Sequence, residues 1–241
     1  MSVLQQFSNV YKDMKMNGIV SNTSYEFDVE YPIFDNPKEY LEFRRGKFIY
    51  GFFKRWSERR AMDKCLKGID DITRVCDVPC GPGRLFKYWQ KRKYRVIGVD
   101  LSDSFVEAAG KMCKELNQEN RVIKGDAFVL KNSLNGYSVD LIAMVRFIYY
   151  FDGKERIKLL KSMAELPVKN LLLQYKTNET WRGRRKLKKI SLNGRSSTKQ
   201  YCSNDEIMDE LKEAGLECIR IVPIAQASDR VFVMAKKNGM R

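Results

Sequence analysis

Beginning at residue 74, short apolar segments alternate with segments of helical length, and this alternation limits the possible folds more than any other feature. Strands that are separated by helices form a parallel sheet with right-handed crossovers. The last two strands follow each other through a short link, which indicates an antiparallel strand at the end. We therefore expect an α/β fold with a mostly parallel seven-stranded sheet and helices on both faces. The expected strands are 74–77, 95–99, 121–124, 139–145, 170–175, 217–222 and 231–235, and the clearest helices are 85–91, 102–116, 154–166 and 204–214.

The N-terminal region has a different composition, with aromatic residues at helical spacing among arginines and lysines. We expect residues 1–69 to form a helical cap or lid, and residues 70–241 to form the main, cofactor-binding domain. A basic, aromatic helix also suits the surface of an anionic membrane. Residues 41–60 are therefore either part of the lid or a peripheral membrane contact. The aromatic residues concerned are Phe48, Phe52, Phe53 and Trp56.

The absence of histidine from all 241 residues removes several kinds of chemistry. Histidine-dependent triads, imidazole bases and most catalytic zinc sites cannot be built from this chain. The six cysteines have no repeated short spacing, so we interpret them as reduced, mostly buried thiols and expect no metal. A secretion signal and a long apolar run are also missing. These features predict a cytoplasmic protein, at the inner face of the membrane if residues 41–60 make the membrane contact.

A turn rich in proline and glycine, DVPCGPGR at residues 77–84, follows the first strand. Gly81 and Gly83 leave the backbone open to a ligand before the next helix, at the sheet edge where α/β folds bind ligands. A dinucleotide and another adenosine cofactor are the two alternatives. The dinucleotide fingerprint needs glycine where Phe86 stands, and the carboxylate of Asp77 disfavours a pyrophosphate. A cationic cofactor such as S-adenosylmethionine instead gains from Asp77.

Two further aspartates follow the second and third strands. Asp100 ends the segment VIGVD, where a carboxylate can accept hydrogen bonds from both ribose hydroxyls. Asp126 can accept one from an adenine amino group, while the small Ala127 leaves room for the ring. A helix cap or a turn would explain any one of these aspartates alone. Three of them at consecutive strand ends, in register with the glycine turn, favour a single cofactor site.

The segments DVPCGPGR, VIGVDLS, EAAGK, VIKGDAFVL and VDLIAMV together resemble the class I S-adenosylmethionine-dependent methyltransferases, over roughly residues 70–235. The resemblance implies a Rossmann-like methyltransferase fold, methyltransferase activity and S-adenosylmethionine as the cofactor. Pro79 departs from the glycine of many members and matches a bacterial subset with the motif PCGxGR. The resemblance places Asp77, Gly81 and Gly83 along the methionine part, Asp100 at the ribose, and Asp126 and Ala127 at the adenine. The cofactor-binding residues implied are Asp77, Pro79, Cys80, Gly81, Gly83, Asp100, Leu101, Gly125, Asp126, Ala127 and Val145.

The segment after the fourth strand lies where this family places acceptor-binding or catalytic groups, often including histidine. Here we predict Arg146 for positioning of the cofactor or acceptor, Tyr149 or Tyr150 for acceptor contact, and Asp152 as a candidate base. Packing beneath the adenine and the lid is the alternative for the aromatic residues. The D/N-P-P-Y/F/W tetrapeptide of planar-nitrogen methyltransferases and a catalytic cysteine are both missing. Methylation of oxygen is therefore the expected reaction.

Residues 182–199 carry eight lysines and arginines and no acid, on a connection longer than the usual two to six residues or so. We interpret this segment as a basic loop that collects an anionic acceptor, with a solvated surface as the alternative. The predicted acceptor-binding residues are Arg182, Arg184, Arg185, Lys188, Lys189 and Arg195.

RNA and an acidic or phosphorylated sugar are the two polyanions that fit this charge. The aromatic and basic N-terminal segment, together with the resemblance to the PCGxGR subset, favours a carbohydrate or glycolipid of the kind made in lipopolysaccharide biosynthesis. The predicted function is O-methylation of such an acceptor. The alternatives are an RNA methyltransferase, an O-methyltransferase of small metabolites and a non-catalytic cofactor-binding protein.

Overall fold

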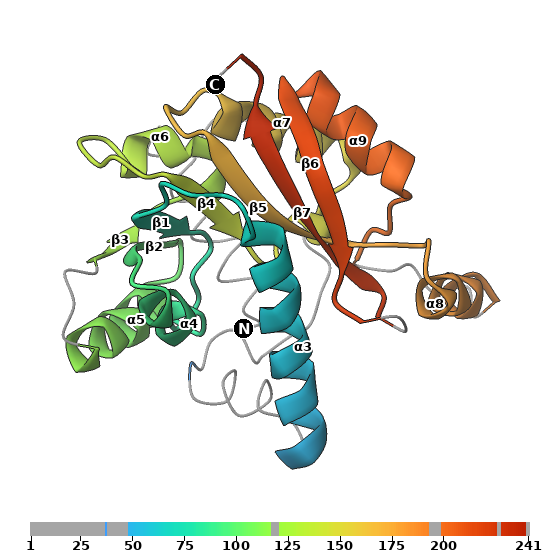
Figure 1. The fold of residues 1–241 in the computed structure, drawn as a ribbon, viewed down its shortest axis with the longest axis horizontal. Coiled ribbons are helices and arrows are strands. Elements are labelled where there is room, and N and C mark those ends of the chain that lie inside the picture. Colours follow the sequence, from blue (N-terminus) through green and yellow to red (C-terminus); the bar gives the residue numbers. More distant parts are fainter. Residues whose placement is uncertain (1–36, 38–47, 117–120, 193–198, 226–227, 240–241) are drawn as a thin grey trace.

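A computed structural model describes residues 37, 48–116, 121–192, 199–225 and 228–239, and within these ranges seven strands form one sheet (Figure 1). The strand order is β3-β2-β1-β4-β5-β7-β6. Neighbours from β3 to β5 are parallel, whereas β7 runs antiparallel to both β5 and β6. The predicted mixed sheet is therefore confirmed, including the antiparallel strand at its end. The strands are β1 (Arg74–Asp77), β2 (Arg95–Asp100), β3 (Arg121–Lys124), β4 (Leu141–Met144), β5 (Asn170–Lys176), β6 (Leu216–Pro223) and β7 (Arg230–Lys237).

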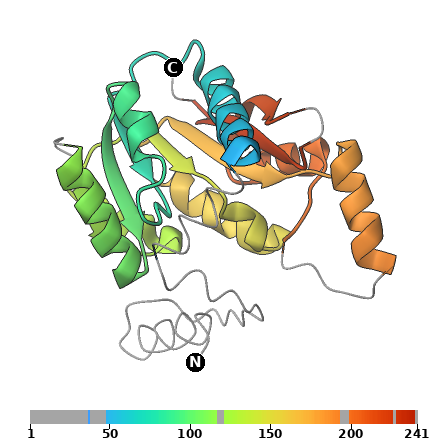
Figure 2. The same cartoon turned by 90° about the horizontal axis from the view of Figure 1, so that it is seen from below.

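Helices cover both faces of the sheet, as predicted (Figures 1 and 2). One core contains Met62, Trp89 and Ala109 from α3, α4 and α5, and the other contains Leu160 and Leu211 from α7 and α9. Alternate residues of the buried strands enter these two cores, because successive side chains of a strand point to opposite faces. The helices are α3 (Phe48–Leu66), α4 (Phe86–Lys91), α5 (Asp103–Glu115), α6 (Leu130–Ser133), α7 (Gly153–Ala164), α8 (Trp181–Leu192) and α9 (Asn204–Glu213), with the 3-10 turns η2 (Ala127–Val129) and η3 (Ile148–Tyr150).

The described part of the N-terminal region is α3, which packs against β6 and β7. Ala61, Met62 and Cys65 are buried at helical spacing on its second half, whereas Phe52 and Trp56 on its first half are exposed. Residues 1–36 and 38–47 lie outside the described ranges, so the division into a cap at 1–69 and a main domain stays a prediction. None of the described helices is long and apolar enough to cross a bilayer.

The basic segment after β5 differs from its prediction as a loop, because residues 181–192 form α8, which lies to one side of the sheet (Figures 1 and 2). Thr180 starts this helix: its hydroxyl accepts a hydrogen bond from the Gly183 amide at 3.1 Å, as in an N-cap. Lysine, arginine and leucine are also good helix formers. The high charge of this segment is therefore compatible with a helix and did not require an irregular backbone.

Candidate active site

The turn after β1 is held against β2 by backbone hydrogen bonds. The Cys80 amide donates to the Val99 carbonyl at 2.9 Å, and the Gly81 amide donates to Asp100 Oδ2 at 2.7 Å. Gly81 and Gly83 have φ of +54° and +79°, a region that favours glycine. A Cβ atom on Gly81 would meet no other atom within 4 Å, so the backbone lies open beside this residue. The backbone is thus open at Gly81, whereas Gly83 is buried and a Cβ atom there would lie 3.0 Å from Phe86 Cδ2.

Asp100 is buried at the end of β2, with its side chain directed toward the glycine turn. Oδ1 accepts a hydrogen bond from the Ser102 amide at 3.0 Å, and Oδ2 accepts the one from Gly81. Burial raises the pKa of this carboxyl to about 6, and the backbone donors at Ser102, Gly81 and Leu101 oppose the rise. A carboxylate has about four lone-pair positions. Asp100 can therefore accept further hydrogen bonds from a ligand's hydroxyl groups.

Asp126 follows β3 and has one oxygen that no described residue satisfies. Its Oδ1 accepts a hydrogen bond from the Phe128 amide at 2.9 Å and so caps η2, whereas Oδ2 is buried without a partner. Burial raises the pKa of this carboxyl. A buried acceptor without a donor is costly, and the amino group of an adenine would supply one. Glycine at position 125 lets Ser133 pack closely against the backbone beside Asp126, since a Cβ atom on Gly125 would lie 2.0 Å from Ser133 Oγ.

Asp77, at the end of β1, lies deeper than an ordinary surface carboxylate. It accepts a hydrogen bond from Trp89 Nε1 at 3.3 Å, and burial raises its pKa to about 7 in spite of the nearby Arg84. A ligand that brings an ammonium and a sulfonium would favour the ionised form. The acidic groups at three consecutive strand ends thus fit a cationic adenosine cofactor, with Asp126 toward the adenine and Asp77 toward the charged end.

The other predicted cofactor residues lie around the same turn and strand ends. Cys80 is buried, its Sγ lies 3.3 Å from the Gly81 carbonyl oxygen, and burial raises the pKa of its thiol well above the usual value. Pro79 precedes it after a cis peptide bond, and Val145 is buried directly beyond β4. Leu101 is partly buried directly after Asp100. These side chains shape the turn and its walls, and none is an activated nucleophile.

The raised carboxyl pKa values predict how cofactor affinity depends on pH. Binding of a cation favours ionised Asp77 and Asp100, whose pKa values in the free protein are about 7 and about 6. We therefore expect the affinity for S-adenosylmethionine to increase as pH rises from 5.5 to 7.5, by roughly tenfold if one proton is released. Calorimetry at several pH values in two buffers of different ionisation enthalpy measures both the affinity and the proton release.

The same groups act in the opposite direction on the stability of the free protein. In the unfolded chain an aspartate has a pKa of 3.8, so between about pH 4 and 7 the folded state binds more protons. The contribution of Asp77 and Asp100 to the free energy of unfolding therefore falls as pH rises through this window. The variant Asp77→Asn should make both the cofactor affinity and the free energy of unfolding depend less on pH. An affinity for the cofactor that stays constant from pH 5.5 to 7.5 would contradict this account.

A buried carboxylate that the sequence analysis missed, Glu58 of α3, lies at the centre of a cluster of arginines. Only 1% of Glu58 is exposed. Its Oε1 accepts hydrogen bonds from Arg146 Nε at 3.0 Å and Nη2 at 2.9 Å, and its Oε2 accepts one from Arg84 at 2.6 Å. Arg230 Nη1 lies 3.6 Å from Oε1, and Gln174 Nε2 donates to Oε1 at 3.2 Å. The cluster joins α3 to the glycine turn and to the ends of β4, β5 and β7.

Charge decides the ionisation of Glu58. Burial opposes its ionisation, but the guanidinium groups of Arg146, Arg84 and Arg230 outweigh burial and hold the pKa of Glu58 well below its usual range. Arg146 has a φ of +65°, which aims its side chain from the end of β4 at Glu58. The sequence contained one signal for this site. Glu58 is the only acidic residue between Lys47 and Met62, within a strongly basic stretch.

The predicted acceptor residues after β4 have mixed positions. Tyr149 is buried, and its ring centroid lies 5.9 Å from Lys176 Nζ. Tyr150 is partly buried, with its ring 5.6 Å from Lys199 Nζ. Asp152 caps α7: its Oδ1 accepts a hydrogen bond from the Glu155 amide at 2.9 Å, and the Glu155 side chain accepts one from the Asp152 amide. This capping box explains Asp152 without a catalytic role.

The basic side chains of α8 are exposed. Arg184 Nη1 donates to the Glu179 carbonyl at 2.6 Å, and the Arg185 guanidinium lies 5.3 Å from the ring centroid of Trp181. Arg195 lies outside the described residues, whereas Arg182, Lys188 and Lys189 are exposed on the helix. α8 thus presents an exposed basic surface.

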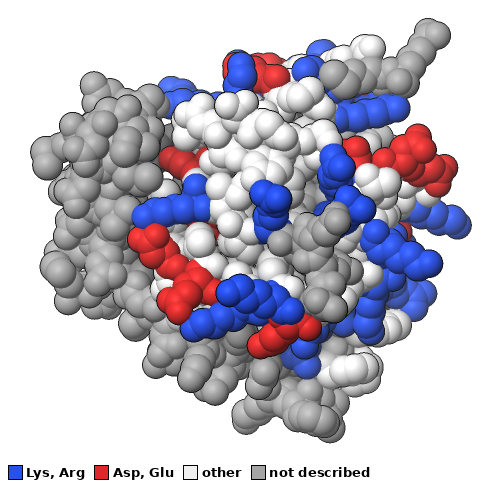
Figure 3. All heavy atoms as spheres, turned by 90° about the vertical axis from the view of Figure 1, so that its left-hand side faces the viewer, with Lys and Arg blue, Asp and Glu red and all other residues white. Residues whose placement is uncertain are grey.

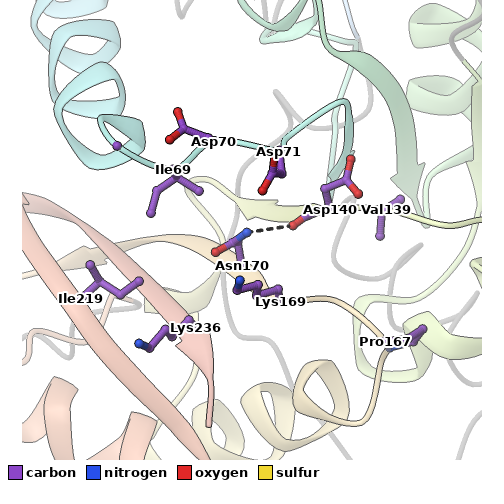
Figure 4. A pocket seen from close by; sticks show the side chains of 11 residues that line it. Ile69, Asp70, Asp71, Val139, Asp140, Pro167, Lys169, Asn170, Ile219 and Lys236 are labelled. Atoms are coloured by element: carbon purple, nitrogen blue, oxygen red, sulfur yellow. Dashed lines mark hydrogen bonds between the residues drawn. The ribbon is translucent and has the colours of Figure 1, made fainter. Parts of the chain in front are cut away.

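A cavity of about 520 Å³ lies at the opposite edge of the sheet (Figure 4). It is lined by the link between α3 and β1 and by the amino ends of β4 and β5, where Asn170 Nδ2 donates to the Asp140 carbonyl at 3.3 Å. The Asp140 carboxylate accepts hydrogen bonds from the Thr73 amide and hydroxyl and the Arg74 amide. Ligands of open α/β sheets bind at the carboxyl ends of the strands. This cavity is therefore separate from the site described above.

Comparison with known proteins agrees with the site. Residues 75–169 match a family described as "Methyltransferase domain". A search of curated proteins gives no match. These residues span β1 to the link before β5, and so include the glycine turn and the three aspartates.

Solved structures of methyltransferases share the fold at low sequence identity. Magnesium protoporphyrin IX methyltransferase from Synechocystis PCC 6803, with bound S-adenosylhomocysteine, has 18% identity and a TM-score of 0.66 over 86% of this chain and 97% of its own. An S-adenosylmethionine-dependent methyltransferase from Clostridium acetobutylicum has 16% identity and a TM-score of 0.62 over 85% of this chain and 100% of its own. A mitomycin 7-O-methyltransferase has 15% identity and a TM-score of 0.63 over 95% of this chain and 67% of its own. The chain therefore has the fold seen in these methyltransferases, and its residues 75–169, which include the glycine turn and the three aspartates, match a methyltransferase domain.

Proposed function

We propose that the protein transfers the methyl group to a hydroxyl oxygen of an anionic acceptor, with an acidic or phosphorylated carbohydrate or glycolipid as the leading class. The observation that carries this proposal is the gathering of basic groups beside the glycine turn. Arg146 already contacts Glu58 through two nitrogens, yet Arg84 and Arg230 approach the same carboxylate. Among the described residues, three guanidinium groups therefore share one carboxylate.

A second shared carboxylate lies close to the first. Asp229 accepts hydrogen bonds from both Lys176 and Lys186, so again two cations share one anion. The carboxylate of the cofactor's methionine part would pair with one of these basic groups. An acceptor with its own carboxylate or phosphate would balance another, and arginine is well suited to bind either group in two places.

Methylation of oxygen is favoured over nitrogen and carbon by the sequence motifs that are missing. Two of the proteins with similar structures are described as O-methyltransferases, and one of these was crystallised with 1,4-dihydroxy-2-naphthoic acid, a hydroxylated aromatic acid. A small metabolite of that chemistry, with a hydroxyl beside an acidic group, is therefore the second candidate. It shares with an acidic sugar the pairing of a nucleophilic oxygen with a negative charge.

RNA is less favoured by the charge distribution on the described surface. On the face beside β3 and α5, basic and acidic side chains are interspersed (Figure 3). Lys111 pairs with Glu107, and Lys124 pairs with Asp103 in this region. α8 carries exposed basic residues along most of its length. On α3, Phe52, Phe53 and Trp56 are 59%, 58% and 49% exposed and lie beside the exposed Lys54. Aromatic and basic side chains on one helix support a contact with an anionic membrane, where a glycolipid acceptor would be found.

The proposal can be tested by supplying methyl-labelled S-adenosylmethionine with four acceptor classes: phosphorylated or acidic oligosaccharides, lipopolysaccharide precursors, hydroxybenzoic acids and RNA. We expect label in a carbohydrate or glycolipid, as an O-methyl group that mass spectrometry locates. Label in a hydroxybenzoic acid would support the small-metabolite alternative. Label that ribonuclease releases, or label on nitrogen, would contradict the proposal.

Neutralisation of the basic surface of α8 tests whether this helix collects the acceptor. With four of its basic residues changed to glutamine, we expect the acceptor KM to rise about tenfold at low salt, because long-range attraction is lost, while kcat and cofactor affinity stay the same. A matched variant with four exposed lysines of other helices changed to glutamine should change KM by less than about twofold. Equal kinetics in both variants would make α8 a solvated surface only. The α8 residues are Arg184, Arg185, Lys188 and Lys189, and the control residues are Lys111, Lys114, Lys131 and Lys161.

A further inference from the structure

Lys176 is a buried lysine at the carboxyl end of β5, and the sequence analysis assigned it no role. Only 7% of the residue is exposed. Leu173 and Tyr175 belong to the core on the α7 side. Because side chains alternate along a strand, Gln174 and Lys176 share the opposite face, where Gln174 contacts Glu58. Lys176 therefore lies on the same side of the sheet as the arginine cluster.

Aromatic rings and one carboxylate surround the ammonium group of Lys176. Its Nζ donates hydrogen bonds to Asp229 Oδ2 and, at 3.2 Å, to the Tyr201 hydroxyl. The ring centroids of Tyr201 and Tyr149 lie 4.8 Å and 5.9 Å from Nζ. The Gln200 amide donates to the Tyr149 carbonyl at 2.7 Å, which fixes the segment with Tyr201 against η3. The lysine is thus held in a defined position.

The topology of the sheet puts Lys176 on the acceptor side of the site. The crossover direction changes between β1 and β4, and ligands of such sheets bind across that point. The three aspartates place the cofactor over β1, β2 and β3, which leaves the ends of β4 and β5 for the acceptor. Gln174, two residues before Lys176, has a buried Oε1 without a partner among the described residues. A hydroxyl or amino group of a bound ligand would supply the missing donor.

We propose that Lys176, in its neutral form, accepts the proton of the acceptor hydroxyl during methyl transfer. This inference rests on the proposed O-methylation. The acceptor oxygen forms a bond to the methyl carbon, the carbon–sulfur bond breaks, and its electron pair stays on sulfur as the sulfonium becomes a thioether. The hydroxyl proton moves to Lys176 Nζ, which becomes an ammonium ion. No further reactant is needed, and bulk solvent later takes the proton.

The surroundings of Lys176 make a neutral amine accessible near physiological pH. Burial lowers the pKa of Lys176 to about 8; the Asp229 carboxylate opposes this change, while Lys186 of α8 and Arg230 of β7 reinforce it. Tyr149 and Tyr201 face the amine with their rings, and burial raises the pKa of the Tyr201 hydroxyl, so it stays protonated. A general base works best when its pKa is near the working pH. In a chain without histidine, a lysine of this kind can fill that role.

The titration of Lys176 can be measured without knowing the acceptor. The protein is labelled with ¹⁵N at the lysine Nζ atoms, saturated with S-adenosylhomocysteine and followed by NMR from pH 6 to 11. The variant Lys176→Met identifies the signal, and Lys161→Met identifies an exposed lysine for comparison. We expect Lys176 to titrate near pH 8. A Lys176 signal that stays protonated above pH 10 would overturn the proposal. Should Lys176→Met fail to fold, Lys176→Arg identifies the signal instead.

The pH dependence of methyl transfer then separates a base from a structural ion pair. The assay uses whichever hydroxyl compound the labelling experiment above shows to be methylated. The variant Lys176→Arg keeps the positive charge beside Asp229 but cannot release a proton. We expect kcat to fall about 100-fold and its rise near pH 8 to disappear, with cofactor affinity and acceptor KM within about threefold of the original. If kcat of Lys176→Arg still rises near pH 8, as in the original protein, the proposal is overturned while O-methylation stands. If no hydroxyl compound is methylated, the proposed function fails, and this inference falls with it.

Discussion

Replacement of Asp100 by alanine is expected to weaken the binding of S-adenosylmethionine by at least about 100-fold. The substitution removes the carboxylate and with it two charge-assisted hydrogen bonds to the ribose, each worth about 1.5–3 kcal/mol. The substitution also removes the acceptor of the Gly81 amide, whose 2.7 Å hydrogen bond to Asp100 Oδ2 keeps the glycine turn in place. Isothermal titration calorimetry with S-adenosylmethionine and S-adenosylhomocysteine measures the effect directly.

Asp103→Ala is the matched control for this experiment. Asp103 lies three residues further on, is exposed, and pairs with Lys124 at 2.8 Å on the surface. Its loss should change cofactor affinity by less than about twofold, since exposed ion pairs contribute little. Circular dichroism should show both variants folded. An unchanged affinity in a folded Asp100→Ala protein would mean that the cofactor does not bind at the end of β2.

Replacement of Glu58 by glutamine is expected to lower the free energy of unfolding by about 3–5 kcal/mol. Removing one member of a buried ion pair leaves the partner charges uncompensated, and here three arginines depend on one carboxylate. Urea unfolding, followed by circular dichroism and fluorescence, measures the change. We also expect weaker cofactor binding, because Arg84 directly follows the glycine turn.

Glu107→Gln provides the comparison for Glu58. Glu107 pairs with Lys111 at 2.7 Å on the surface of α5, with both side chains 71% exposed. Such a pair contributes well under 1 kcal/mol, so unfolding should be nearly unchanged. If Glu58→Gln costs less than about 1 kcal/mol, the arginine cluster is not the anchor that joins α3 to the ends of the strands.

The positions of the glycine turn and the three aspartates at one edge of the sheet could be predicted from the sequence because their signals are local. Each aspartate follows an apolar strand directly, and the glycines lie within a few residues of the first. Parallel strands bring their carboxyl ends to one edge, so sequence order alone places Asp77, Asp100 and Asp126 together. The predicted strands are confirmed, because short apolar strands alternate in the sequence with segments whose apolar residues follow the period of a helix. Only the strand ends differ, by one or two residues.

The contacts around Glu58 and Lys176 could not be predicted in the same way, because they join distant segments of the chain. Glu58 is hydrogen-bonded to Arg146 and Gln174, which lie 88 and 116 residues further along the chain. A local sequence pattern cannot predict contacts at such separations. Lys176 fell just beyond the strand expected at 170–175, so it was not considered as a residue of the sheet edge. Asp152 illustrates the reverse error: a carboxylate in an expected catalytic segment that begins a helix.

A crystal structure of the protein with S-adenosylhomocysteine tests the central claim most directly. We predict both ribose hydroxyls within about 3 Å of the Asp100 carboxylate, the adenine amino group at Asp126 Oδ2, and the sulfur directed toward the ends of β4 and β5, where Arg146 and Lys176 lie. A ligand bound away from the glycine turn, or one whose sulfur points toward β3, would contradict the account.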